Sequence, residues 1–381
     1  VYYTNQAWPL LAATDEVLST TDYDSYDFDH NGADDAHYLT RYDGELSQAG
    51  YLGAPDLRVT GQATRTRTRV LGVAGTAPGA WLSATSFTDE QLRPIQVQST
   101  NARGGDDVNT IRFDFAGKPL VSVTDHGGPN HASIALRETF IYDPTGRLLE
   151  TRQELDGRRP VTIAANSYNE LGQLQQKHLG GSKMQSALQT VDYAYNVRGW
   201  LTHVNDAQLT PKPGQRADLF GLELSYDRGF TTNQYNGNIA GQKWRAASDN
   251  VERAYGYRYD QLSRLLQGDF VARDAAGTWN AERDNYRFWA ASYDANGNLL
   301  TMRRRGLVQE ANGTTARHYG DIDNLRYRYQ PLAASPTPGS NRLLRVDDLA
   351  PLPNSFGTLQ PTRPDFQDGN THSSQQPDYA Y

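Results

Sequence analysis

The fold of this chain is decided by a ten-residue stretch, FIYDPTGRLL at residues 140–149. Residues 140–142 alternate with the two-residue period of a β-strand. The four residues that follow suit a type I turn, because the Asp143 carboxylate can accept backbone hydrogen bonds and Gly146 tolerates the positive φ that follows such a turn. Residues 148 and 149 then open a returning strand. The stretch therefore predicts the tip of a β-hairpin.

The same pattern recurs down the chain at intervals of about 30 residues. A Tyr is followed by Asp or Asn and, in most copies, by Gly three residues further on. The clear copies are Tyr142-Asp143 with Gly146, Tyr168-Asn169 with Gly172, Tyr195-Asn196 with Gly199, Tyr259-Asp260 without a glycine, and Tyr293-Asp294 with Gly297. Weaker copies lie at residues 113–120 and 226–230. Repeats of this period are typical of solenoids, propellers and hairpin arrays.

Each repeat has room for two strands of roughly 12 residues, and the apolar residues of these strands alternate. Leu222, Leu224 and Tyr226, for example, fall on one face of their strand. We therefore predict an all-β fold of tandem long β-hairpins that form one continuous antiparallel sheet with a packed face and a polar face. Helical signals are weak, and the best helix candidate is residues 249–255. The glycines at 146, 172, 199 and 297 are expected to have positive φ.

Composition supports the strand-rich prediction and excludes several functions. The chain has 23 Tyr and 34 Gly but only 2 Met and no Cys, so disulfides, thiolate metal sites and a cysteine nucleophile are excluded. The net charge is −7 and the charges are interspersed, which argues against nucleic acid as a partner. No apolar run approaches the roughly 20 residues of a membrane helix, so no membrane span is expected in this segment.

With these copies laid out, residues 113–301 resemble the Rhs/YD-repeat family, whose long tandem arrays carry a Tyr-Asp pair followed by Gly and an apolar residue. The resemblance implies a sheet of hairpins that spirals into a hollow shell or barrel, as in toxin cocoons, polymorphic-toxin carriers and adhesion proteins. It also implies a protein that is secreted or lies at the cell surface of a Gram-negative bacterium. The Asp-rich core at which toxin-bearing members cleave themselves is not found here, so autoproteolysis is not carried over.

The domain organisation follows from where the copies are clear. Residues 1–110 are expected to form a divergent β-rich segment that belongs to the same array, and residues 111–381 a YD-repeat array that continues beyond the C-terminal end. Tyr2, Tyr3, Tyr379 and Tyr381 read as parts of strands at the two ends. We interpret the chain as an internal piece of a longer polypeptide, and we expect it to associate through its open edges when it is expressed alone.

The most site-like run lies between residues 27 and 35. Asp27, Asp29, Asn31 and Asp34 place oxygen ligands as in the first half of a calcium loop, but Tyr38 stands where a bidentate Glu is expected. A solvated acidic turn is the interpretation we favour, so calcium is the weaker alternative and no other cofactor is expected. No motif for a zinc protease, an α/β-hydrolase or a nucleotide site is present. No catalytic residue is assigned, and we expect that this segment is not an enzyme.

The function that this sequence favours is structural: a β-shell scaffold that encloses or presents another part of the polypeptide, such as a toxin or an effector. Its expected partners are the flanking repeats and the C-terminal region of the same polypeptide, with export machinery or a target-cell glycan as further candidates. The alternative is a cell-surface adhesin, in which exposed Tyr and Trp would stack on carbohydrate. A repeat-built enzyme is a distant third.

Overall fold

The computed structural model describes residues 17–46, 54–70, 80–128, 131–181, 187–228, 232–309, 316–331 and 338–350. These residues form 21 β-strands, which belong to one sheet, and one helix, α1 (Asp43–Leu46). The chain divides into two compact units. The first comprises residues 1–167 and 177–188, and the second comprises residues 168–176 and 189–381.

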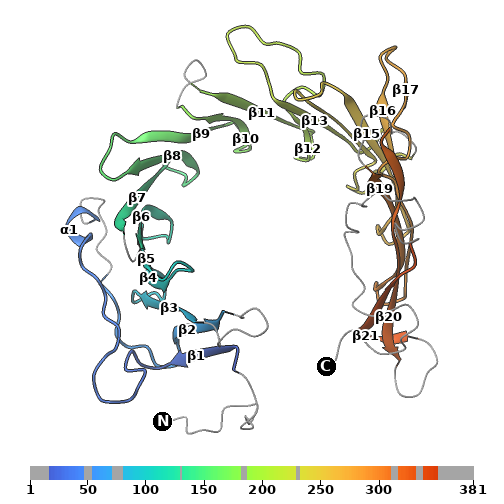
Figure 1. The fold of residues 1–381 in the computed structure, drawn as a ribbon. Coiled ribbons are helices and arrows are strands. Elements are labelled where there is room, and N and C mark those ends of the chain that lie inside the picture. Colours follow the sequence, from blue (N-terminus) through green and yellow to red (C-terminus); the bar gives the residue numbers. More distant parts are fainter. Residues whose placement is uncertain are drawn as a thin grey trace. The chain divides into compact units, whose positions relative to one another are not determined.

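In the first unit, each strand pairs antiparallel with the next strand along the chain, as the ribbon shows from blue to green (Figure 1). The strands are β1 (Ser19–Tyr23), β2 (Ala63–Arg69), β3 (Trp81–Thr88), β4 (Pro94–Thr100), β5 (Asp106–Phe113), β6 (Pro119–Gly128), β7 (His131–Tyr142), β8 (Leu148–Leu155) and β9 (Val161–Tyr168). β10 (Leu174–Leu179) pairs with β9 and is divided between the units.

The second unit repeats the scheme, and β16 pairs with both β17 and β18. Its strands are β11 (Gln189–Tyr195), β12 (Leu201–Val204), β13 (Phe220–Ser225), β14 (Gly241–Ala246), β15 (Glu252–Tyr259), β16 (Leu265–Arg273), β17 (Trp279–Ala281), β18 (Phe288–Tyr293), β19 (Leu299–Gln309), β20 (His318–Pro331) and β21 (Pro338–Asp348). All pairings described in this unit are antiparallel.

The prediction of an all-β array of hairpins in one antiparallel sheet is confirmed. Strand pairing does not close the sheet into a barrel, because within the described residues β1 pairs only with β2 and β21 only with β20. Two details of the expectation are wrong. Most strands have six to ten residues rather than 12. Residues 249–255 are not helical, because Asp249 accepts a hydrogen bond from the Val251 N–H in a turn that leads directly into β15.

The buried side of the first unit is more polar than the alternating pattern predicts. The segment before β2 lies on this side and contributes Tyr26, whose ring stacks on that of Phe87 at 4.6 Å between centroids. Gln96 on β4 is 1% exposed and exchanges two hydrogen bonds with the backbone of Leu39. Arg112 on β5 is also 1% exposed and pairs with the Asp43 carboxylate at 2.6 Å. Polar side chains thus fix α1 and its flanking loop to the sheet.

Candidate functional site

The residues that define the repeat meet at the hairpin tips, where one turn geometry recurs. In each such tip the N–H of the first residue donates to the carbonyl of the fifth, and the N–H of the fourth donates to the carbonyl of the first. Among the described residues this pair of bonds occurs at nine tips: 89–93, 101–105, 114–118, 143–147, 169–173, 196–200, 260–264, 274–278 and 294–298. The strand register shifts beside several of these turns, as in the Ile141/Tyr142 step. This combination is a type I turn that ends in a bulge.

The fourth residue of these tips has a left-handed backbone. Its φ is 83° at Gly146, 78° at Gly172, 78° at Gly199 and 89° at Gly297, so the expectation of positive φ is confirmed at all four glycines. Two tips keep this geometry without glycine. The fourth residue is Ser263 in one, with φ of 63°, and Leu92 in the other, with φ of 62°. The backbone therefore sets the conformation of the tip even where the residue disfavours it.

The first residue of the tip caps the turn with its side chain. The Asp143 Oδ1 atom accepts hydrogen bonds from the N–H groups of Thr145 and Arg147, both at 2.9 Å. The bond from the Arg147 N–H is the main cause that holds the pKa of Asp143 well below its ordinary value. Asn169 and Asn196 accept the corresponding pair of bonds with their amide oxygens. Capping needs an oxygen acceptor but does not need a charge, which explains why both Asp and Asn occur at this position.

The tyrosine of most repeats ties its tip to the preceding repeat. The Tyr293 hydroxyl donates to the carbonyl of Leu265, which opens the returning strand of the tip before it, at 2.8 Å. The same link is made by Tyr142 to Pro119, Tyr195 to Leu174, Tyr226 to Leu201, Tyr259 to Ile239 and Tyr329 to Leu299, at 2.9–3.0 Å. We call these six hydrogen bonds the tyrosine links. Burial raises the pKa of Tyr142, Tyr226, Tyr259 and Tyr293 above its ordinary value, so these hydroxyls keep their proton.

At some tips, a basic residue at the fifth position bonds to the next tip along the chain, whereas the tyrosine bonds to the preceding repeat. The Arg264 guanidinium pairs with Asp260 in its own turn and donates to the carbonyl of Asp294 in the next tip, at 2.9 Å. It also lies 4.7 Å from the centre of the Tyr293 ring. Arg93 does the same with Asp89, the carbonyl of Asp114 and the ring of Phe113. Sequence reasoning missed this role, although an Arg at the fifth position of the turn, as at Arg93 and Arg264, was a visible signal.

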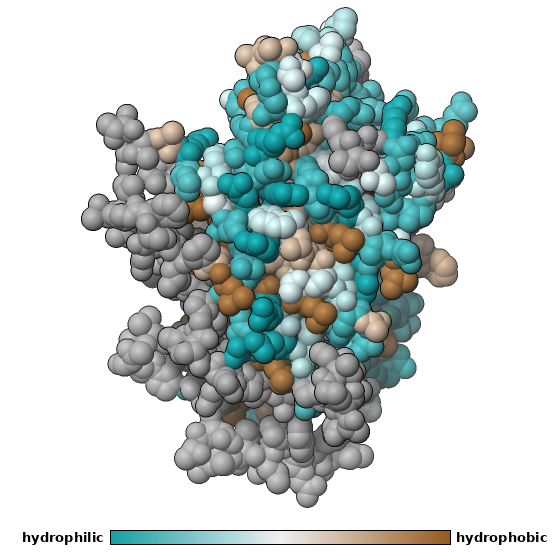
Figure 2. Space-filling view, turned by 90° about the vertical axis from the view of Figure 1, so that its right-hand side faces the viewer, coloured by the Kyte–Doolittle hydropathy of each residue, from teal (hydrophilic) through white to brown (hydrophobic). Residues whose placement is uncertain are grey.

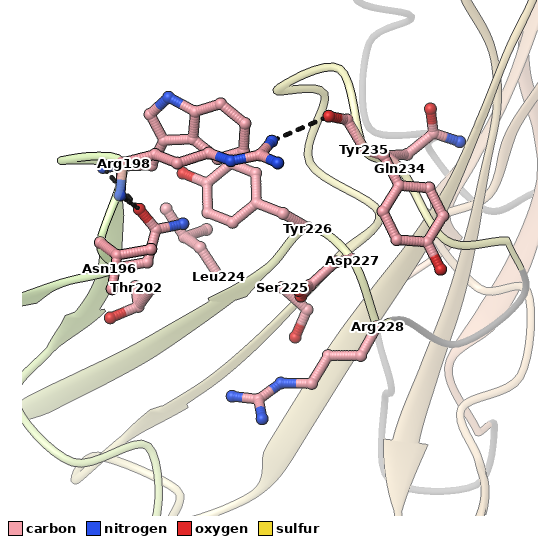
Figure 3. Close-up of a pocket in the computed structure, with 12 residues that line it drawn as sticks. Asn196, Arg198, Thr202, Leu224, Ser225, Tyr226, Asp227, Arg228, Gln234 and Tyr235 are labelled. Atoms are coloured by element: carbon pink, nitrogen blue, oxygen red, sulfur yellow. Dashed lines mark hydrogen bonds between the residues drawn. The ribbon is translucent and has the colours of Figure 1, made fainter.

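The copy at Tyr226 departs from the repeat. Tyr226 keeps its tyrosine link, but the loop to β14, which the structure describes at residues 227–228 and 232–240, is longer than a tight turn, and in it the Gln234 N–H donates a 2.7 Å hydrogen bond to the Tyr226 carbonyl. A pocket of about 360 Å³ opens between this loop and the neighbouring tip at 196–200 (Figure 3). The prediction of a repeat at 226–230 is confirmed for the link of its tyrosine, and residues 229 and 230 of its turn lie outside the described residues.

The calcium candidate is only partly assembled. Carboxylate oxygens of Asp27, Asp29 and Asp35 lie within 4.8 Å of one another, whereas Asp34 does not belong to this group. The carboxylates already accept backbone hydrogen bonds, from Gly32 to Asp27 at 2.9 Å and from Asn31 to Asp29 at 3.1 Å. Burial acts to raise the pKa of Asp27, but the bonds from Gly32 and Asn31 outweigh it and leave the pKa below its ordinary value. This arrangement fits a self-capped acidic turn, and calcium stays a prediction.

The surface of the second unit shown in Figure 2 is mainly hydrophilic, with hydrophobic side chains in separate spots. Within the described residues no helix is both long and apolar enough to cross a membrane.

Comparison with known proteins gives matches only among solved structures, since neither a family model nor a curated sequence matches the chain. The chain is similar to the crystal structure of TcdB2-TccC3-TEV, with 11% identity and a TM-score of 0.29. It is also similar to TcdB2-TccC3 without the hypervariable C-terminal region (13%, TM-score 0.28) and to the Tc holotoxin pore of Photorhabdus luminescens (12%, TM-score 0.25). The matches cover 72%, 72% and 76% of this chain, which spans only 17%, 17% and 15% of those chains.

Proposed function

We propose that this chain is a structural scaffold, a segment of the β-wall of a secreted or surface-exposed protein of the Rhs/YD-repeat type. The wall encloses or presents another part of the same polypeptide, of the toxin or effector kind. The observation that carries the proposal is the set of tyrosine links, because they use the residue that defines the repeat to join one repeat to the next.

The chemistry of the tips supports this function. Asp143 and Asp260 cap their turns and pair with arginines, and the tyrosine hydroxyls donate to backbone carbonyls. Groups engaged in this way position the backbone and are not free to attack or protonate a substrate. A repeat whose tyrosine and arginine side chains bond to the neighbouring repeat resembles a unit of a solenoid, in which stability comes from the interfaces between repeats.

The test uses the intact gene product with a specific protease site inserted into the segment that follows this chain. If the wall encloses that segment, we expect cleavage in the native protein to be slower than cleavage after heat unfolding by at least about tenfold, because access then requires local opening. The combined variant Tyr195→Phe, Tyr226→Phe and Tyr293→Phe should accelerate native cleavage, and Tyr235→Phe, which removes an exposed hydroxyl, is the matched control. Equal cleavage rates in the native and unfolded protein would refute enclosure.

A further inference from the structure

The loop between β12 and β13, residues 205–219, holds one lysine beside two carboxyl groups. The Lys212 Nζ atom forms an ion pair with the carboxylate of Asp192 on β11, and it lies 3.5 Å from the Oδ2 atom of Asp218. All three residues belong to the second unit. An amine, a carboxyl group in direct contact with it and a second carboxyl group therefore meet at one nitrogen atom.

The loop that carries Lys212 is fixed in shape. Pro211 and Pro213 flank the lysine, and the proline ring fixes φ at both positions. The Asp206 carboxylate accepts a hydrogen bond from the Gln208 N–H at 2.9 Å, which stabilises the turn at the start of the loop. The backbone therefore presents the Lys212 side chain to β11 in one position.

Asp192 is oriented by contacts on both sides of its strand. Its Oδ1 atom accepts a hydrogen bond from the Gln176 side chain of β10 at 2.9 Å. Its backbone N–H donates to the side-chain oxygen of Asn205, and the Asn205 N–H donates to its carbonyl, both at 2.8 Å. The Oδ2 atom contacts Lys212. One carboxyl oxygen is thus held by the sheet, and the other meets the amine.

Asp218 differs from an ordinary surface carboxylate. Its side chain is 4% exposed, and its Oδ2 atom is buried without a hydrogen-bond partner among the described residues. Burial raises the pKa of Asp218 above its ordinary value, against the opposing effect of Lys212. Burial also acts to lower the pKa of Lys212, but the hydrogen bond and the charge of Asp192 outweigh it, so the resting amine is protonated. A buried carboxyl group that holds a proton beside an ion pair is suited to general acid catalysis.

We propose that Lys212 and Asp192 form an intramolecular isopeptide bond. The Lys212 Nζ atom first passes one proton to the Oδ2 atom of Asp192, which converts the ion pair into a neutral amine and a carboxylic acid. The amine then attacks the Asp192 Cγ atom as a nucleophile. Asp218 donates a proton to the departing hydroxyl and takes one from the nitrogen, so it ends as it began. One C–N bond forms, one C–O bond breaks, and one water molecule leaves.

Contact in the folded chain and the composition of the chain both favour this bond. Groups that a fold holds in a reactive geometry react as if the partner were present at about 10⁵–10⁸ M. The chain has no Cys, so a disulfide cannot brace it. A bond between Lys212 and Asp192 would tie the loop to β11 and restrict the unfolded chain as a disulfide does.

Mass spectrometry of the full chain tests the bond directly. The denatured chain should weigh less than its sequence by the mass of one water molecule. After digestion with trypsin, peptides 184–198 and 199–216 should appear as one linked species, because the first contains Asp192 and the second contains Lys212. Lys212→Arg keeps the positive charge without the nucleophilic amine and should restore the full mass. In a time course after in vitro synthesis, Asp218→Asn should slow linkage by about 100-fold or more.

The ion pair between Lys243 and Glu223, at 2.9 Å, is the matched control, because contact in an ordinary ion pair should leave both peptides unlinked. The full sequence mass in the parent chain would overturn the proposal. So would a water loss confined to peptide 199–216, which a succinimide at Asp206 would produce. Equal rates in the parent and in Asp218→Asn would overturn the role of Asp218 as the acid. The inference is independent of the scaffold proposal, since neither Lys212 nor Asp192 makes a tyrosine link.

Discussion

The hydroxyl of Tyr293 donates a hydrogen bond to the backbone carbonyl of Leu265, 28 residues earlier in the chain, at 2.8 Å. Leu265 opens the strand that follows one hairpin tip, and Tyr293 closes the strand that leads to the next tip. The bond therefore joins two successive repeats at the ends of their strands, beside the hairpin tips. Five other tyrosines make the same bond, one in the first unit and four in the second.

Tyr293→Phe should lower the free energy of unfolding by about 1 kcal/mol, because it removes one hydrogen bond and leaves the Leu265 carbonyl without its donor. Urea unfolding followed by tyrosine fluorescence and circular dichroism measures the change. Tyr235→Phe is the control, because the Tyr235 side chain is largely exposed and its ring stays in place. An equal loss in both variants would mean that the link contributes nothing beyond an ordinary surface hydroxyl.

The backbone strain at the tips predicts opposite effects for two substitutions. Gly297→Ala should destabilise the protein by about 1–2 kcal/mol, because alanine is forced into a left-handed conformation. A Cβ atom at Gly297 would meet nothing within 4 Å, so strain alone causes this loss. Leu92→Gly should stabilise the protein by about 0.5–1 kcal/mol, because it relieves the same strain at a residue with φ of 62°. Thermal unfolding of both variants checks the pair, and a change of the same sign in both would contradict the assignment.

The fold could be predicted because the repeat is local. The alternation before Tyr142 and the turn residues from Asp143 to Gly146 specify a hairpin without help from distant parts of the chain. The left-handed conformation of Leu92 in the tip at residues 89–93 could not be predicted, because glycine is expected at that position and only the surrounding strands force leucine into this region. The pocket could not be predicted, because a sequence that begins like a repeat at Tyr226 gives no sign that Gln234 will close the loop. The same holds for the burial of Arg112, which depends on Asp43, 69 residues away.

The capping carboxylates predict a loss of stability in acid. The N–H of Arg147 bonded to Asp143 and the N–H of Arg264 bonded to Asp260 are the main causes that lower the pKa of each carboxyl group in the folded chain. A pKa lowered by folding contributes stability above the unfolded value of about 3.9, and that stability is lost as the pH falls through the folded value. The urea concentration at the midpoint of unfolding should therefore decrease as the pH is lowered from about 5 to about 2.

The combined variant Asp143→Asn and Asp260→Asn tests this origin, because asparagine caps the tips at Asn169 and Asn196. We expect this variant to lose less stability than the parent over the same pH range, since the amide does not titrate. Equal acid sensitivity in the two proteins would show that other carboxylates cause the effect.

Calcium should leave the thermal midpoint unchanged. Asp27, Asp29 and Asp35 already accept hydrogen bonds from nearby backbone N–H groups, so the turn between them is stable without an ion. Extracellular calcium modules bind with Kd values of about 0.1–1 mM, so about 10 mM calcium would reveal a site of that kind. A rise of the midpoint in calcium that Asp27→Asn abolishes would establish the alternative interpretation.

The contact between Arg112 and Asp43 predicts that α1 depends on one buried charge. Asp43→Ala should destabilise the first unit by about 1–3 kcal/mol, because it leaves the guanidinium of Arg112, 1% exposed, without its carboxylate. The loss should appear as faster amide hydrogen exchange in residues 37–44, which the pair holds on the sheet. The double variant Asp43→Ala and Arg112→Met should be more stable than Asp43→Ala alone, because it removes the unpaired buried charge. A double variant that is no more stable than the single one would show that α1 is held by its other contacts, chiefly the bonds between Gln96 and Leu39.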